Sequence, residues 1–365
     1  MTAPVWGIRP RRYPGRLPER ADVLVVGGGI TGVALLHWLR GRAGAVLVER
    51  DRLAAGASGR NAGFLVAGVA GSHAAAVRRY GRERAAALRA FTVETHGLLA
   101  AALGGRAPSY RPAGSDLVAV GPEEARDLEE SCDLLRADGF DVSWDGARLR
   151  APGDGELDPV EAVHALAGDA PDGAIREGVT VDGLEAGPDG VVVRAGPREC
   201  RAGAVVLATN AYTRLLAAEV PIEPVRAQMA ATTSAAAGLV ERPASADRGY
   251  RYWRQLPDGR VLAGGYRDRA LEEEVGYAAV PTTRVQAYLD AHLRGLGVGA
   301  PVTWRWAGIM GFTADELPVV GPLAGRPGVW ACGGYNGHGL AFAFQCARRV
   351  AEALTGARAA TRLLP

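Results

Sequence analysis

Short apolar runs and helical patterns alternate at the start of the chain. An apolar run at Val23–Val26 is followed by a glycine-rich stretch at 27–32 and then by apolar residues at helical spacing. A second apolar run, Ala45–Val48, ends at Glu49. Apolar runs of this length, bounded by glycine, are typical of buried strands. The pattern therefore predicts a strand, a glycine turn, a helix and a second strand, in that order.

The spacing of the glycines favours phosphate binding at this turn. Gly27 permits the tight turn, Gly29 lets the backbone approach a pyrophosphate, and Gly32 allows the helix to pack close to the strand. The helix N-terminus adds free N–H groups and the positive end of its dipole. Glu49 follows about 20 residues later, where an acid would accept hydrogen bonds from ribose hydroxyls. The unit predicts an adenine-dinucleotide site. These residues alone do not distinguish NAD from FAD.

Periodicity and turn residues outline the rest of the chain. Helices are expected over His73–Leu103, Pro122–Asp138, Pro159–Ala167 with Asp158 as N-cap, Thr282–Leu293 and Leu340–Leu354. Strands are expected at Gly114–Val120, Val179–Ala186, Gly190–Ala195, Ala204–Ala208, Tyr250–Leu256, Arg260–Gly264 and Val329–Cys332, with a loop after Trp304.

Two domains are expected, because 365 residues exceed the usual size of a single core. The run at 204–208 resumes the character of the first strand, so the dinucleotide-binding domain is predicted to be discontinuous. The predicted fold is α/β, a Rossmann-like domain combined with an α+β substrate domain on an antiparallel sheet. The first domain is assigned residues 1–75, 155–215 and 305–365, and the inserted substrate domain residues 76–154 and 216–304.

Composition argues against several functions. Apolar residues make up 48% of the chain and charged residues 22%, as in an ordinary soluble globular protein. The formal net charge of +2 gives no support for nucleic-acid binding. No apolar run is long enough to span a membrane. The N-terminus lacks the apolar core of a secretory signal, so a cytoplasmic location is expected.

Two residue types restrict the chemistry further. The chain has no lysine, since all 42 basic residues are arginine, and this excludes a lysine Schiff base and hence a pyridoxal phosphate enzyme. The four cysteines, Cys132, Cys200, Cys332 and Cys346, have no CxxC spacing. We therefore expect neither a metal site nor a disulfide framework, which fits a reducing compartment.

Four further segments occur in a characteristic order. They read ASGRNAGF at 57–64, VVLATNAYT at 205–213, WRWAGIMGFTADELPVVG at 304–321 and WACGGYNGHGL at 330–340. Together with the glycine turn, this set resembles the D-amino-acid-oxidase-like family of FAD-dependent oxidoreductases over essentially the whole chain. That family includes glycine oxidase, monomeric sarcosine oxidase and the γ-glutamylputrescine oxidoreductases. ASGRNAGF, GYNGHGL and the stretch YWRQLPDGRVLAGG at 252–265 are most similar to the last of these.

The resemblance implies that FAD is the cofactor. Because FAD is longer than NAD, segments distant from the glycine turn must hold its isoalloxazine ring. Ser58–Gly63 would pass beneath the flavin, and the turn at 337–339 would place a positive helix end near flavin N1 and O2, which favours the reduced state. The residues expected to bind FAD are Gly27, Gly29, Ile30, Thr31, Gly32, Glu49, Arg50, Ser58, Gly59, Arg60, Asn61, Ala62, Gly63, Val179, Ala208, Thr209, Asn210, Gly308, Gly334, Tyr335, Asn336, Gly337, His338, Gly339 and Leu340.

Departures from the family pattern imply that FAD is bound non-covalently. In monomeric sarcosine oxidase a cysteine tethers the flavin, and Gly308 stands at the equivalent position here. In the dimethylglycine-dehydrogenase-like branch a histidine performs the tethering, and Arg60 occupies that place. Cys332 is close to the flavin by sequence context, although a small buried residue before a turn explains it equally well.

The resemblance also implies where the substrate binds. Glycine oxidase has an arginine for the substrate carboxylate where this chain has Met310. A methionine cannot pair with a carboxylate. The substrate is therefore either an amine without an α-carboxylate at that point, which we favour, or it is bound by another arginine. Tyr250 and Tyr252 share one face of a predicted strand and Trp253 the other. The two tyrosines form either an amine-holding wall or sheet core.

The sequence offers two candidates for the residue that promotes the reaction of the flavin with oxygen. In monomeric sarcosine oxidase a lysine near the flavin promotes the reaction with oxygen, because a cation stabilises superoxide. Arg254 and His338 are the candidates for this catalytic role here. Arg254 would equally suit a structural ion pair within a strand.

These features predict FAD-dependent oxidation of a C–N bond. An amine or N-substituted amino acid would give an imine, and O2 would reoxidise the flavin and yield H2O2. Two alternatives remain: an NAD(P)-dependent dehydrogenase that uses the same turn, and a flavin-binding pathway subunit with no turnover alone. The expected partners are a small-molecule amine and O2, with no metal, nucleic acid or membrane. Substrate identity and oligomeric state stay open.

Overall fold

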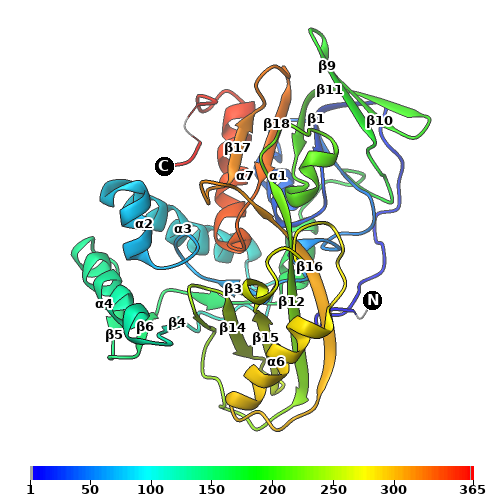
Figure 1. Ribbon diagram of the computed structural model, residues 1–365. Coiled ribbons are helices and arrows are strands. Elements are labelled where there is room, and N and C mark those ends of the chain that lie inside the picture. Colours follow the sequence, from blue (N-terminus) through cyan, green and yellow to red (C-terminus); the bar gives the residue numbers. More distant parts are fainter. Residues whose placement is uncertain (1–2, 362) are drawn as a thin grey trace.

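Two eight-stranded sheets dominate the computed structural model, which describes residues 3–361 and 363–365 (Figure 1). The first sheet has the order β17-β18-β11-β1-β2-β8, and β10 and β9 extend it from β11. β1 pairs in parallel with β2 and with β11. β2 also pairs in parallel with β8, and β11 pairs in parallel with β18. The carboxyl ends of these strands therefore lie at one edge of the sheet. The strands are β1 Arg20–Val26, β2 Ala45–Glu49, β8 Ile175–Glu177, β9 Gly183–Gly187, β10 Gly190–Ala195, β11 Arg198–Leu207, β17 Val319–Pro322 and β18 Val329–Gly333.

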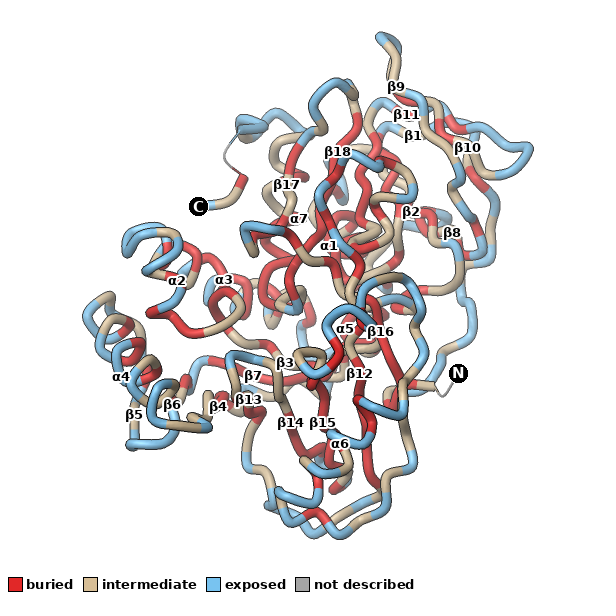
Figure 2. The backbone as a smooth tube through the Cα atoms, viewed as in Figure 1, coloured by how far each residue is buried: buried red, intermediate tan, exposed pale blue. Residues whose placement is uncertain are grey.

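Both faces of this sheet are buried. Along β1, Val23 and Val25 belong to one apolar cluster, whereas Leu24 and Val26 belong to another on the opposite face. Successive side chains of a strand point to opposite faces, so a strand covered on both sides has a continuous apolar run. Figure 2 shows β18 and the carboxyl-terminal parts of β1 and β11 as buried, in contrast with the exposed outer turns of α2 (His73–Tyr80) and α4 (Pro122–Ala137).

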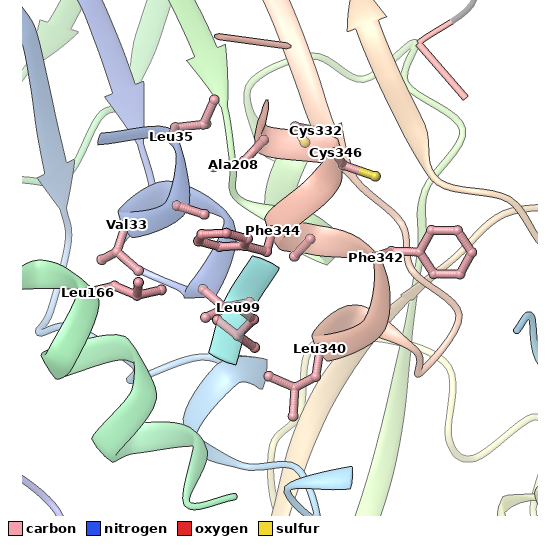
Figure 3. Packing of buried hydrophobic residues seen from close by; sticks show 14 of the residues in the cluster. Val33, Leu35, Leu99, Leu166, Ala208, Cys332, Leu340, Phe342, Phe344 and Cys346 are labelled. Atoms are coloured by element: carbon pink, nitrogen blue, oxygen red, sulfur yellow. The ribbon is translucent and has the colours of Figure 1, made fainter. Parts of the chain in front are cut away.

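Helices cover one face of the first sheet and form the largest core. Phe344 of α7, Val33 of α1 and Leu99 of α3 belong to one buried cluster (Figure 3). Cys332 and Cys346 are fully buried in the same cluster. α3 lies in a segment that the sequence assigned to the substrate domain, yet its buried residues pack in this core. The helices are α1 Ile30–Leu39, α3 Arg82–Leu103, α5 Pro159–Ala167 and α7 Gly339–Leu354.

The second sheet has the order β16-β12-β15-β14-β13-β4-β6-β5. Its strands pair antiparallel, as predicted, except that β13 and β4 are parallel. Trp253 of β14 packs against the His292 ring of helix α6 (Thr283–Gly295), with the ring centroids 4.9 Å apart. The strands are β4 Ser115–Val118, β5 Ser143–Trp144, β6 Arg148–Ala151, β12 Glu223–Ser234, β13 Ala244–Ala246, β14 Arg251–Gln255, β15 Arg260–Gly265 and β16 Val302–Phe312. Two short strands, β3 Phe64–Leu65 and β7 Gly155–Glu156, pair separately.

Most of the predicted elements are confirmed, and four differ. The helix expected at 73–103 is broken into α2 and α3 at Gly81, whose φ of +81° no helix interior adopts. Residues 179–182 lie outside a strand, although the Val179 N–H donates to the carbonyl of Glu49 at the end of β2. β12 was not predicted as one long strand. In place of the loop expected after Trp304, residues 302–312 form β16, which pairs with β12 along nearly its whole length.

No helix among the described residues is both long and apolar enough to cross a membrane, and these residues form no cluster of three or more metal-ligating side chains. The four cysteines are buried and unbonded to one another.

The first helix depends on one glycine. A Cβ atom at Gly32 would lie 1.9 Å from the carbonyl oxygen of Gly27 and 3.0 Å from Leu47. Helix α1 therefore approaches β1 and β2 more closely than any other residue at this position would permit, as the glycine spacing predicts.

We expect Gly32→Ala to lower thermal stability although alanine is the better helix former. Overpacking costs about 1–3 kcal/mol, whereas the gain in helix propensity is about 1 kcal/mol. Gly97→Ala is the matched control, because Gly97 lies in helix α3 with no atom within 4 Å of its Cβ position. The control should unfold at or above the wild-type temperature in a thermal scan. A Gly32→Ala protein as stable as wild type would contradict the packing argument.

Candidate active site

A cavity of about 790 Å³ opens at the carboxyl ends of the parallel strands and extends to the second sheet. Its lining begins with residues that follow β1, β2 and β11, which is where ligands bind in open α/β sheets. The far wall comes from β14, β15 and β16. Of the predicted cofactor residues, the lining includes Gly27, Gly29, Ile30, Thr31, Glu49, Arg50, Ser58, Arg60, Asn61, Ala62, Val179, Ala208, Thr209, Asn210, Gly308, Tyr335, Asn336, Gly337, His338, Gly339 and Leu340.

The glycine turn presents free backbone donors to this cavity. No described residue accepts a hydrogen bond from the N–H of Gly29 or Thr31. The neighbouring N–H of Ile30 donates to the Ser58 hydroxyl at 2.9 Å. A helix N-terminus with unused donors is a site for an anion such as a pyrophosphate.

Glu49 is held at the edge of the turn by two backbone donors. Its Oε2 accepts from the N–H of Gly28 at 2.7 Å, and its Oε1 accepts from the N–H of Asp51 at 2.8 Å. Burial raises the pKa of the Glu49 carboxyl, and these two hydrogen bonds oppose that shift. Each carboxylate oxygen accepts more than one hydrogen bond, so the side chain retains capacity for ribose hydroxyls.

The loop at 57–63 is fixed by its own side chains and by β16. The Arg60 guanidinium donates to the carbonyls of Ala55 and Ala307, and the Trp306 indole donates to the carbonyl of Arg60 at 2.9 Å. A Cβ atom on Gly308 would lie 2.9 Å from the Cβ of Arg60. The loop and β16 therefore pack directly against each other along one side of the cavity.

The turn before α7 is the second helix start that faces the cavity. Asn336, with a φ of +51°, accepts from the N–H of Thr313 through its side chain and donates its own N–H to Gly311. No described residue accepts from the N–H of Gly339 or Leu340 at the start of α7. The positive end of this helix is thus directed toward the cavity, as the sequence predicts.

These features fit an FAD. The cavity joins a phosphate-binding turn, a ribose-binding acid and a second helix N-terminus, and it is long enough to contact segments from both sheets. Arg50 stacks on Tyr212 with its Cζ 4.2 Å from the ring centre, beside Glu49. Non-covalent binding, which the residues at Gly308 and Arg60 led us to expect, stays a prediction.

Four of the predicted cofactor residues do not line the cavity: Gly32, Gly59, Gly63 and Gly334. Their Cβ positions are occupied by other atoms of the chain. A Cβ atom at Gly59 would lie 2.2 Å from the carbonyl oxygen of Ala54, and one at Gly63 would lie 2.1 Å from that of Leu157. These glycines permit close backbone packing behind the residues that line the cavity.

Tyr250, Tyr252 and Met310 all line the cavity on the side of the second sheet. Trp253 packs into the core on the opposite face of β14, as the alternation predicts. Burial raises the pKa of Tyr252 to about 12, so its hydroxyl stays protonated at physiological pH. The Sδ of Met310 lies 3.6 Å from the Cβ position of Gly337, which places it next to the turn before α7.

Arg254 does not line the cavity, which argues against its predicted contact with the reacting groups. Its side chain is only 3% exposed, and its Nη1 donates to the carbonyls of Ala62, Gly63 and Leu157. Its Nε lies 3.0 Å from a carboxylate oxygen of Glu156. Burial lowers the pKa of Arg254 to about 10, which keeps it charged at neutral pH. The fold therefore contains the structural ion pair, which was the alternative role of Arg254 that the sequence left open.

His338 lies in the cavity, but its environment opposes a positive charge. Burial lowers the pKa of the imidazole, and its Nδ1 lies 3.5 Å from the carbonyl oxygen of Asn336. A neutral ring can exchange hydrogen bonds with substrate or cofactor, and it does not supply the cation expected for oxygen activation. Cys332 is fully buried behind the cavity lining, and burial raises the pKa of its thiol to about 12.

Sequence reasoning missed several residues of the far wall, and two of them carry large side chains. Arg267 and Phe312 both line the cavity. Phe312 is two positions after Met310 on β16, so the strand alternation of that segment would have predicted it. Arg267 follows β15 in a short turn, Arg267–Arg269, and no periodic pattern marks it.

Comparison with known proteins assigns the family. The model of the family described as "DAO: FAD dependent oxidoreductase" matches residues 22–353. Because this match covers most of the chain, the protein belongs to that family. It is therefore an FAD-dependent oxidoreductase, as the motifs predict, and the NAD(P)-dependent alternative is wrong.

Individual relatives agree with this assignment. The chain is 29% identical over 335 residues to the tRNA 5-methylaminomethyl-2-thiouridine biosynthesis bifunctional protein of Maricaulis maris, covering 92% of this chain and 52% of that protein. It is 30% identical over 192 residues to glycine oxidase of Pseudomonas putida, covering 51% of this chain and 48% of that protein. The chain thus spans about half the length of the curated relatives it matches.

Solved structures show the same fold. Glycine oxidase of Geobacillus kaustophilus aligns with a TM-score of 0.78 at 21% identity, covering 94% of this chain and 96% of that one. L-amino acid deaminase of Proteus myxofaciens aligns with a TM-score of 0.77 at 15% identity, covering 99% and 96%. The predicted similarity to the γ-glutamylputrescine branch stays a prediction.

We expect Gly29→Leu to give a folded but colourless protein. The first side-chain atom would already lie 2.8 Å from the Ser58 hydroxyl, and the rest would fill the space beside the free N–H groups. Loss of pyrophosphate contacts worth more than about 1.4 kcal/mol weakens binding more than tenfold. The measurement is the visible flavin absorbance per protein, with circular dichroism to confirm folding. Gly97→Leu, on the exposed side of α3, should stay yellow. Wild-type flavin content in Gly29→Leu would rule out this position for the pyrophosphate.

Proposed function

We propose that the protein oxidises a C–N bond of an amine or N-substituted amino acid to an imine. The observation that carries this proposal is the continuity of one cavity. It runs from the FAD cradle at Gly29 and Glu49 to a wall formed by Tyr250, Tyr252 and Met310. When bound there, FAD supplies a two-electron acceptor for the hydride of the substrate.

The residues around the cavity favour this chemistry by orientation and desolvation. The aromatic rings of Tyr250 and Tyr252 offer flat surfaces that hold an amine, and the Tyr252 hydroxyl has no hydrogen-bond partner among the described residues. A cavity that excludes water favours the neutral form of the amine, because burial disfavours the charged form. Orienting the reacting C–H bond then supplies much of the catalysis, with little demand for side-chain acids or bases.

Met310 supports an amine without an α-carboxylate at this point. It lines the cavity beside the turn before α7, and a thioether makes no charge-assisted hydrogen bond. The alternative, that another arginine binds an α-carboxylate, requires a guanidinium in the cavity that is free of other partners. Arg60, on the adjacent loop, is engaged by the carbonyls of Ala55 and Ala307.

O2 is the electron acceptor that we propose, with H2O2 as the product. A flavin-binding pathway subunit without turnover of its own is the remaining alternative. It would be yellow and would form no peroxide alone, so a peroxide assay separates the two.

Anaerobic mixing with a panel of primary and secondary amines tests the reaction. We expect at least one amine to bleach the flavin absorbance, because hydride transfer reduces the cofactor. Admission of air should restore the absorbance and release about one H2O2 per flavin, as the two-electron stoichiometry requires. If no amine bleaches the flavin, the proposed reaction is wrong. Bleaching that persists in air would instead assign a dehydrogenase.

Met310→Arg should shift specificity toward α-amino acids. The new guanidinium would supply a charge-assisted, bidentate partner for an α-carboxylate, and such a contact is worth about 1.5–3 kcal/mol. We therefore expect kcat/KM for glycine and sarcosine to rise about tenfold or more relative to an uncharged amine. Met310→Leu, which is apolar and similar in volume, is the control and should leave the ratio unchanged. An unaltered ratio in Met310→Arg would remove the argument from this position.

A further inference from the structure

The arginines that line the cavity differ in what occupies their guanidinium groups. Arg60 and Arg89 donate to backbone carbonyls, and Arg248 pairs with Glu123. Arg50 makes no such bond but stacks on Tyr212 within the FAD cradle. Arg267 also makes no hydrogen bond or ion pair to the described residues, and it lies on the wall of the second sheet, away from the cradle segments.

The Arg267 guanidinium is held between two aromatic rings. Its Cζ lies 4.3 Å from the ring centre of Tyr250 and 4.7 Å from that of Phe312. Such stacking uses the faces of the planar group. The five N–H donors point outward in the plane of the group and stay available. The rings therefore fix the orientation of Arg267 and leave its hydrogen-bonding edge unused.

Neighbouring carboxylates do not neutralise this charge. Asp268, the next residue, pairs with Arg269 at 3.0 Å. Glu274 is buried against Arg226 and also accepts from Gln228, each at 2.8 Å. Both acids are committed to other partners, so neither is paired with the Arg267 guanidinium.

We propose that Arg267 binds a carboxylate of the substrate. A guanidinium whose orientation is fixed and whose donor edge is free matches the two oxygens of a carboxylate. Tyr250 and Phe312 form the two sides of this subsite, and the Tyr252 hydroxyl lies on the same wall of the cavity.

The position of the subsite defines the substrate class. Met310 adjoins the turn before α7, and Phe312 lies two residues further along β16, roughly 6.8 Å away at the usual strand rise. Because Met310 adjoins the turn before α7, at the cofactor end, we place the oxidised C–N bond beside Met310 and the carboxylate beside Phe312. On this placement, the substrate is an amine whose carboxylate is several bonds from the oxidised C–N bond. This assignment of the reacting end rests on the proposed function.

Binding of a carboxylate probe tests Arg267 without turnover. The yellow holoenzyme is titrated with benzoate and with benzamide, its uncharged analogue, and the change in the flavin spectrum is followed. We expect benzoate to bind about ten- to a hundredfold more tightly, the range for a hydrogen bond to a charged group. Arg267→Gln should abolish this preference. Arg267→Lys, which keeps the charge but not the planar fork, should retain only part of it.

Arg269→Gln is the matched control. Arg269 lies in the same short turn, its side chain is 48% exposed, and it does not line the cavity. The substitution removes the same charge from the same turn and should leave the benzoate preference intact. Equal binding of benzoate and benzamide by wild type, or the same loss in both glutamine variants, would overturn the proposal.

A pair of amines then tests the substrate class. Flavin reduction by 4-(methylamino)butanoate is compared with reduction by its primary amide under anaerobic conditions. We expect a preference for the carboxylate of about tenfold or more in wild type and Arg269→Gln, and none in Arg267→Gln. Equal reduction by both compounds would overturn the anionic substrate class and leave amine oxidation standing. Tight benzoate binding without reduction by any amine would refute the proposed reaction and leave the carboxylate subsite standing.

Discussion

The buried guanidinium of Arg254 is the interaction on which the active site depends. It joins the second sheet to the loop beneath the cofactor by donating to the carbonyls of Ala62 and Gly63, and to Leu157 of the segment before α5. Its pairing with Glu156 leaves the charge compensated in a site that water hardly reaches. Removal of one member of a buried pair leaves an uncompensated charge, which is far more costly than loss of a surface pair. This junction, together with the contacts of Arg60 and Trp306 between the loop and β16, fixes the relative position of cradle and substrate wall.

Two helix starts give the cavity its character at the cofactor end. The turn at Gly29 and the turn before Gly339 both direct unused N–H groups into the same space, although they come from opposite ends of the chain. Parallel strands bring these turns to one edge of the sheet. The result is a surface that favours negative charge both at a pyrophosphate and at a reduced flavin.

At the substrate end, long strands of the second sheet set the chemistry. β16 carries Gly308, Met310 and Phe312 on one face, and these pass in order from the Arg60 loop to the aromatic residues around Arg267. The proposed positions of the cofactor, the oxidised C–N bond and the substrate carboxylate therefore follow one another along a single strand. A loop in this segment, as the sequence predicted, would not hold these three residues at regular spacing.

The sequence by itself determined the dinucleotide turn, the acid at Glu49, the final helix and the family, because each rests on local spacing of glycines and apolar residues. It also placed Tyr250 and Tyr252 on one face, since strand alternation is a local property. Local patterns did not reveal the partners of Arg254, which lie 97 to 192 residues away in the chain. For the same reason the stacking of Arg267 between Tyr250 and Phe312 was not predictable. Whether an arginine is a catalytic cation, a structural pair or a carboxylate site depends on its distant neighbours, and only the tertiary structure decides these.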